Sequence, residues 1–187
     1  MRLFVAVWPT DEVVRAVVAV ASELRARADA EGSGAGVRWT RPDQWHVTMR
    51  FLGSVHDDEV DSLRASLAAV AARSAGGAVI EAVLEDATSA FCRSVLVVPV
   101  AGLGELAAAV VAATAGFGEA PEERPFSGHL TLARARPRDR RGRGVRACTG
   151  APVPAMRWTV GELTLVRSVT SAAGATHEIV GRWPLGS

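Results

Sequence analysis

The sequence predicts an α+β fold in which two similar lobes face each other across a cleft. The first observation is a strand–helix–strand pattern that occurs twice, with a proline closing the first strand of each unit. The second is a motif of histidine, apolar residue, threonine and apolar residue, found at His46–Met49 and again at His129–Leu132. The third is size, because 187 residues with 49% hydrophobic content can bury the core of one domain or of two small lobes.

The first unit is defined by its boundary residues. Pro9 ends an opening strand rich in β-branched and aromatic residues, and Thr10 is a suitable N-cap for a helix with apolar residues at helical spacing. Gly53 is expected to end the first motif strand, and Asp57 begins a further helix. The predicted elements are a strand at 2–8, a helix to about residue 30, a loop at 31–36, an extended piece at 37–40, the motif strand at 45–52 and a helix whose buried residues lie between 60 and 70.

The second unit repeats this order. A continuous apolar run ending at Pro99 indicates a buried strand, and Gly102 leads into a third helix. The predicted elements are strands at 79–87 and 94–100, a helix with inward residues between 103 and 113, a loop at 116–125, the second motif strand at 128–135, an arginine-rich segment, and strands near 158–167 and 176–183.

The two motifs mount the same polar pair on two strands. Because side chains at i and i+2 share one face of a strand, His46 and Thr48 point to one face and their apolar neighbours to the other. His129 and Thr131 form a second pair in the same way. A two-fold relation between the units would bring the two histidines face to face across one cleft.

Two facing histidines can act as a general acid and a general base. Histidine titrates near pH 6.5, so one ring of a pair can be neutral while the other is protonated. Hydrolysis at phosphorus needs both roles, because water must lose a proton and the leaving oxygen must gain one; each role contributes about 10²–10⁴ in rate. The threonine hydroxyls could hold the non-bridging phosphate oxygens.

Other chemistries find less support. A zinc site needs three or four ligands, and no third ligand accompanies either motif. No nucleophile elbow accompanies a serine or cysteine. Covalent phosphorylation of a histidine stays open. His56 is predicted to be a solvated or capping residue, and a structural role is favoured for His177.

The net charge and the lengths of the apolar runs limit the partners and the cellular compartment expected for the protein. The net charge is +1, so no global field attracts nucleic acid, and no apolar run is long enough to span a bilayer. We expect a cytoplasmic protein whose two cysteines, Cys92 and Cys148, form neither a metal motif nor a disulfide framework. The chain contains no lysine, and seven of its arginines lie between 134 and 146, either as an RNA-backbone arm or as a solvated loop.

The chain resembles the two-histidine phosphoesterases, in particular the RNA 2′,3′-cyclic phosphodiesterases of the LigT/ThpR family. The resemblance covers nearly the whole chain and rests on five stretches: RLFVAVWP at 2–9, WHVTMRFLG at 45–53, RPFSGHLTLAR at 124–134, LTLVRS at 163–168 and RWPL at 182–185. Paired motifs in this order and at this spacing are a specific signal.

The resemblance implies a fold and an activity. The fold is a single bilobal domain over residues 1–187, with antiparallel sheets and outer helices around a central cleft. The activity is hydrolysis of RNA 2′,3′-cyclic phosphate ends to 2′-phosphates without metal or cofactor, on an RNA or oligonucleotide partner and with no obligate protein partner. By analogy His46 is the proton donor, His129 the proton acceptor, and Thr48 and Thr131 bind the phosphate; the sequence alone does not assign the two histidine roles.

Further substrate contacts are expected from residues beside the motifs. Arg134, after the second motif, is the better phosphate contact, whereas Arg50 lies on the predicted face of His46 and could reach another part of an RNA. Arg124 and Phe126 precede the second motif, and for Phe126 a position in the core is favoured over stacking on a base.

The chain departs from the family pattern at two places. Ser127 and Gly128 stand before His129, where the family often has a proline. The chain has no tyrosine, and His177 stands where a tyrosine is common. Two alternative functions stay open: a cyclic phosphodiesterase for a small nucleotide such as a cyclic phosphate of ADP-ribose, and a non-catalytic RNA- or nucleotide-binding module.

Overall fold

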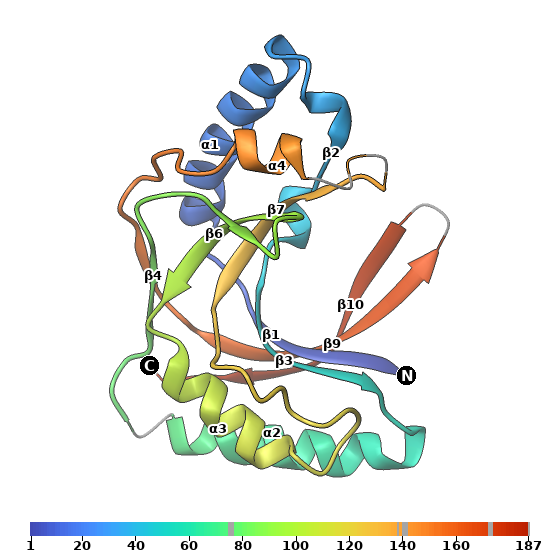
Figure 1. Ribbon diagram of the computed structural model, residues 1–187. Coiled ribbons are helices and arrows are strands. Elements are labelled where there is room, and N and C mark those ends of the chain that lie inside the picture. Colours follow the sequence, from blue (N-terminus) through green and yellow to red (C-terminus); the bar gives the residue numbers. More distant parts are fainter. Residues whose placement is uncertain (75–76, 138, 140–141, 172–173, 187) are drawn as a thin grey trace.

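Two antiparallel sheets form the two lobes of the protein (Figure 1). The computed structural model describes residues 1–74, 77–137, 139, 142–171 and 174–186. The first sheet has the strand order β10-β9-β1-β3, and the second has the order β2-β7-β6-β4-β8 with β5 paired to β6. The predicted α+β fold is confirmed, and β3 and β7, the strands of the two motifs, lie one in each sheet.

The elements of the first half are β1 (Arg2–Val7), α1 (Asp11–Ala30), η1 (Gly34–Gly36), β2 (Val37–Trp39), η2 (Pro42–Gln44), β3 (Val47–Ser54), η3 (Asp57–Glu59) and α2 (Val60–Ser74). Those of the second half are β4 (Glu81–Leu84), β5 (Ser89–Phe91), β6 (Val95–Ala101), α3 (Gly104–Thr114), β7 (His129–Ala135), α4 (Arg143–Ala147), β8 (Arg157–Thr159), β9 (Glu162–Ser171) and β10 (Gly174–Pro184).

Most predicted elements are present, with differences at five places. The N-cap at Thr10 is confirmed, since its hydroxyl accepts a hydrogen bond from the Val13 amide. The first motif strand does not end at Gly53, because that residue adopts a φ of 64° inside a register shift and the strand continues to Ser54. The predicted strand at 79–87 is shorter, the region 158–167 forms two strands, and β5 and α4 were not predicted.

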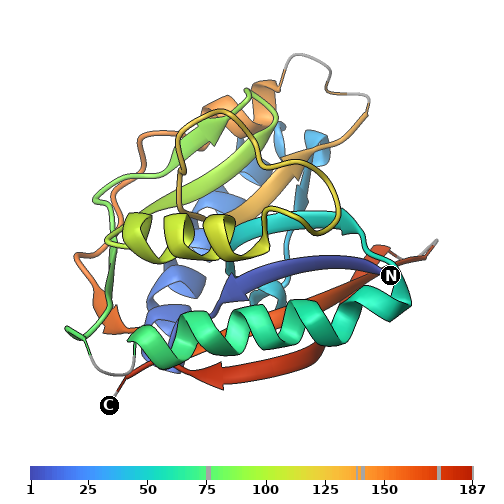
Figure 2. The same cartoon turned by 90° about the horizontal axis from the view of Figure 1, so that it is seen from below.

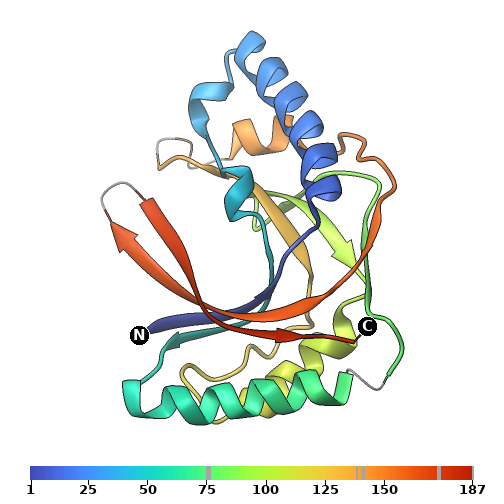
Figure 3. The same ribbon diagram turned by 180° about the vertical axis from the view of Figure 1, so that it is seen from behind.

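Each lobe is completed by the helix of the other strand–helix–strand unit. Helix α1 follows β1 of the first sheet but lies beside β2 and α4 of the second lobe (Figures 1 and 3), where Arg27 donates a 2.6 Å hydrogen bond to the Ala147 carbonyl oxygen. Helix α3 follows β6 of the second sheet but packs against α2 and β3 (Figure 2). The connecting helices therefore cross between the lobes and tie them together.

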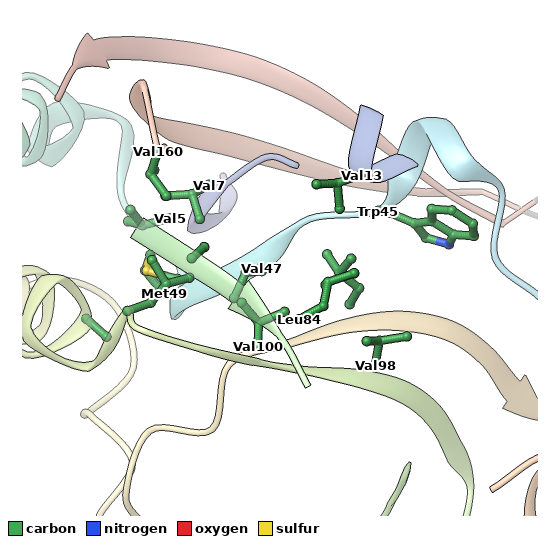
Figure 4. Packing of buried hydrophobic residues seen from close by; sticks show 14 of the residues in the cluster. Val5, Val7, Val13, Trp45, Val47, Met49, Leu84, Val98, Val100 and Val160 are labelled. Carbon is green, nitrogen blue, oxygen red and sulfur yellow. The ribbon is translucent and has the colours of Figure 1, made fainter. Parts of the chain in front are cut away.

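The buried core includes side chains from both sheets (Figure 4). Val5, Val7 and Val47 of the first sheet belong to the same buried cluster as Val98 and Val100 of the second. The predicted alternation along the motifs is also confirmed: Val47 is fully buried, whereas Thr48 is half-buried. Burial of the apolar residues thus fixes the motif strands and leaves the polar pairs on the opposite face.

Candidate active site

The first motif holds its histidine by a backbone carbonyl and an aromatic wall. The Nδ1 atom of His46 lies 2.8 Å from the carbonyl oxygen of Gln44. The ring stacks on Phe4 with centroids 4.9 Å apart and lies 5.3 Å from the ring of Trp8. Because a carbonyl oxygen only accepts hydrogen bonds, Nδ1 is the protonated nitrogen, and Nε2 remains for a ligand.

The second motif repeats this arrangement. The Nδ1 atom of His129 lies 2.8 Å from the carbonyl oxygen of Ser127, again two residues upstream, and the ring stacks on Phe91 with centroids 5.2 Å apart. A side chain at Gly128 would place Cβ 2.6 Å from the carbonyl oxygen of Val100. The close approach of β6 therefore favours glycine directly before His129 in this chain.

A shared β-bulge follows the threonine of each motif. The pairing of β3 with β1 skips Met49, and the pairing of β7 with β6 skips Leu132, which is the same fourth position. An extra residue reverses the alternation beyond it, so that Thr48 and Arg50 point to opposite faces of β3. The bulge therefore determines which face of the strand the residues after the motif occupy.

The prediction that Arg50 shares the face of His46 is therefore wrong. Arg50 is only 5% exposed, and its Nη1 atom donates a 2.6 Å hydrogen bond to the Thr114 hydroxyl. Its Nη2 atom donates to the carbonyl oxygens of Phe117 and Glu119 at 3.2 and 2.9 Å. The guanidinium thus binds the end of α3 and the loop behind it, and Arg50 also lines the cavity between the two motif strands.

A cavity of about 690 Å³ is lined by residues of both motifs, although His46 and Thr131 are not among its lining residues. Thr48 lines it from the first lobe, and His129 and Arg134 line it from the second. Small residues of α3, such as Ala107 and Ala108, form an apolar wall. This volume lies within the range of roughly 300–1,000 Å³ that is typical of small-ligand pockets.

The residues before the second motif border the same cavity. Phe126 is 37% exposed and lines the cavity, so the alternative that it packs in the core is wrong. Arg124 also lines it, pairs with Glu122, and places its guanidinium 5.0 Å from the centre of the Phe91 ring. Phe91 therefore lies between the guanidinium of Arg124 and the ring of His129.

The electrostatics of His46 reflect its surroundings. The pKa of His46 is lowered to about 4, mainly by burial and to a smaller extent by the positive charges of His177, His129 and Arg134, while the Gln44 carbonyl acts in the opposite direction. The two motif histidines are thus close enough to influence each other. At neutral pH and without ligand, His46 is neutral.

A third histidine reaches the site from the last strand. The ring of His177 meets His46 edge-on, with centroids 5.1 Å apart. The sequence favoured a structural role because alternation alone does not decide which face of β10 this residue occupies. His56, in contrast, lies in a capping box in which its amide donates to the Glu59 carboxylate at 3.1 Å, so the predicted capping role is confirmed.

Part of the arginine-rich segment is folded. The Asp139 carboxylate accepts hydrogen bonds from the amides of Arg143 and Gly144 at the start of α4, and these bonds lower the pKa of Asp139. Arg136 donates to the carbonyl oxygen of Val37. Three further arginines of this segment lie outside the described residues: Arg138, Arg140 and Arg141.

The described part of the chain contains no candidate metal-binding cluster, disulfide or membrane-spanning helix. No group of three histidine, cysteine, aspartate or glutamate side chains there is arranged to hold a metal ion. Cys92 is exposed and Cys148 is buried, both as free thiols. None of the helices within the described ranges is both long enough and apolar enough to cross a membrane.

The fold is that of the two-histidine phosphoesterases. Residues 12–79 match the family described as LigT like Phosphoesterase. An RNA 2′,3′-cyclic phosphodiesterase of Geobacillus stearothermophilus is 32% identical over 136 residues, which are 70% of this chain and 41% of that protein. The chain belongs to the LigT-like phosphoesterase family, and its match spans about two fifths of the length of that curated relative.

Solved structures share the whole fold. TT0787 of Thermus thermophilus has a TM-score of 0.76 and 26% identity over 99% of this chain and 98% of that chain. E. coli LigT in its apo form has a TM-score of 0.69 and 24% identity over 100% of this chain and 98% of that chain. The PDE domain of MHV ns2, at 15% identity over 96% of this chain and 100% of that one, has a TM-score of 0.60 and shares the fold.

Proposed function

We propose that the protein is a metal-independent phosphodiesterase that hydrolyses RNA 2′,3′-cyclic phosphate ends to 2′-phosphates. The observation that carries this proposal is the matched anchoring of the two imidazoles, each by Nδ1 on a carbonyl oxygen at 2.8 Å. Anchoring leaves both Nε2 atoms for proton transfer. The name of the Geobacillus relative, RNA 2′,3′-cyclic phosphodiesterase, supplies the reaction and the substrate class.

The reaction needs proton transfers on opposite sides of phosphorus. Water attacks the cyclic phosphate as one imidazole takes its proton, the bond to the 3′ oxygen breaks, and the other imidazole gives a proton to that oxygen. Because attacking and leaving oxygens lie roughly in line, the acid and the base have to approach from different sides. His46 and His129 belong to different lobes, which supports this division of roles.

We propose His46 as the proton donor and His129 as the acceptor, with one condition. The lowered pKa of His46 leaves it neutral in the ligand-free protein, so it has to gain its proton as the anionic substrate binds. A negative phosphate close to an imidazole raises the pKa of that ring. Thr48, Thr131 and the guanidinium of Arg134 would hold the non-bridging oxygens and the developing charge.

The cavity offers room for the terminal nucleoside. Phe126 and Arg124 border it close to His129, and exposed aromatic rings and guanidinium planes stack on bases. These contacts extend the proposal from a phosphate site to a nucleotide site. All the proposed contacts lie within residues 1–187, which we propose to act as a single bilobal unit.

The test is an assay on a short RNA with a 2′,3′-cyclic phosphate end, followed by phosphorus NMR. The expected product is the 2′-phosphomonoester, formed at the same rate with and without EDTA. A 3′-phosphate product, or loss of the rate in EDTA that added metal restores, would contradict the proposal. Comparison with an ADP-ribose cyclic phosphate distinguishes the small-nucleotide alternative, and binding of the RNA without turnover distinguishes a non-catalytic module.

A further inference from the structure

His177 and His46 share one aromatic environment although only His46 belongs to a motif. His177 lies on β10 opposite Ser168 of β9. Its ring meets His46 edge-on, at an interplanar angle of 81° and a centroid distance of 5.1 Å, and it meets Phe4 at the same distance. Phe4 therefore contacts both imidazoles, and the two histidines are direct neighbours.

The His177 ring reaches both the protein interior and an open cavity. Its Nδ1 atom is buried and has no hydrogen-bond partner among the described residues. The ring also lines a second cavity of about 560 Å³, together with Trp8 and Asp43. Burial lowers the pKa of His177, and the nearby Asp43 charge acts in the opposite direction. His177 can thus exchange protons with solvent, although a protonated ring would bury an unsatisfied N–H group.

We propose that His177 is a positioning residue that controls when His46 takes up its proton. Two imidazolium charges at this separation repel each other, so the first proton taken up by the pair opposes the second. An anion bound at Thr48 and Arg134 supplies the opposite charge that lets His46 become protonated. When His177 is protonated, it thereby adds to the effect of burial and opposes protonation of His46 until substrate is present, and this regulation rests on the proposed function of His46.

Other charged groups surround the pair without ring contact to His46. The positive groups that act on His46 besides His177 are His129 and Arg134 of β7. The charged residues that line the second cavity with His177 are Arg41, Asp43, Glu162 and Arg182, and they form the ion pairs Arg41–Asp43 and Arg182–Glu162. Glu178, the next residue on β10, pairs with Arg167 at 3.7 Å. His177 is therefore the titratable neighbour in ring contact with His46.

The test is an NMR titration of the histidine rings between about pH 3 and pH 8, which spans the usual histidine range. The variants are His177→Phe, which keeps an aromatic ring without charge, and His177→Gln, which keeps polarity without charge. The expected result is an upward shift of the His46 midpoint in both variants, with no shift in the remote control His56→Gln. An unchanged or lowered His46 midpoint in a folded His177 variant overturns the proposal.

A kinetic profile provides the second readout. If His46 has to be protonated as substrate arrives, the alkaline limb of kcat/KM against pH moves to higher pH in His177→Phe. A merely structural role for His177 would lower the rate at every pH and leave the limb in place. The titration needs no turnover, so failure of the coupling and failure of the proposed phosphodiesterase activity give different results.

Discussion

The two motif histidines have the same local geometry and different surroundings. Each ring is anchored by Nδ1 to the carbonyl two residues upstream and stacked on a phenylalanine, and each motif threonine precedes a β-bulge. His46, however, has Trp8 and His177 around it, whereas His129 lines the open cavity. The duplicated strand pattern thus gives two imidazoles with the same local geometry, and the neighbouring elements give them different environments.

Removal of either imidazole should have the largest effect on activity. We expect kcat/KM to fall about 10²–10⁴-fold in His46→Ala and in His129→Ala, since each removes one proton-transfer group. The double variant should fall by less than the product of the two, because the pair acts as a unit. His56→Ala is the matched control and should keep full activity, and full activity in both single variants would contradict the acid–base pair.

The two arginines that follow the motifs should separate activity from stability. Arg50→Met removes the donors to Thr114, Phe117 and Glu119 and should lower the free energy of unfolding by about 1–3 kcal/mol, measured by urea denaturation. Arg134→Gln should leave that free energy nearly unchanged and lower kcat/KM, because both arginines line the cavity but Arg134 is exposed whereas Arg50 is buried in hydrogen bonds within the protein. The reverse pattern would place the phosphate contact at Arg50.

The buried environment of His46 should also appear in the pH dependence of stability. Its pKa is about 4 in the folded protein against 6.5 unfolded, so the unfolded chain binds more protons between these values. Stability is therefore complete above about pH 6.5 and is lost as the pH falls toward 4, by up to roughly 3 kcal/mol.

The matched variant for this prediction is His46→Gln. Its stability should depend less steeply on pH over the same interval, because the titrating group is gone. Denaturation at several pH values measures the difference between the two proteins. Equal slopes for the wild type and His46→Gln would show that His46 keeps an ordinary pKa when folded.

The sequence predicted what local patterns determine and missed what long-range packing determines. Alternation placed His46 and Thr48 opposite the buried Val47 because the pattern repeats within four residues. It misplaced Arg50, because a bulge depends on pairing with β1 rather than on composition. The family resemblance predicted the second motif. It did not predict the contact between His177 and His46, which lie 131 residues apart along the chain.

The exchange of helices between lobes was also missed, for a related reason. Apolar spacing identified α1 and α3 correctly, since each needs one buried face. It did not tell which sheet each face covers. That choice depends on contacts between residues far apart in sequence, such as the hydrogen bond from Arg27 to Ala147 and the one from Arg50 to Thr114 at the end of α3.

The unequal roles of the two histidines can be tested most directly with a substrate whose leaving 3′ oxygen is replaced by sulfur. A thiolate leaves without a proton, so the donor becomes dispensable while the acceptor does not. We expect His46→Ala to recover most of its rate on this substrate and His129→Ala to recover none. Recovery by His129→Ala instead, or equal behaviour of the two variants, would contradict His46 as donor and His129 as acceptor.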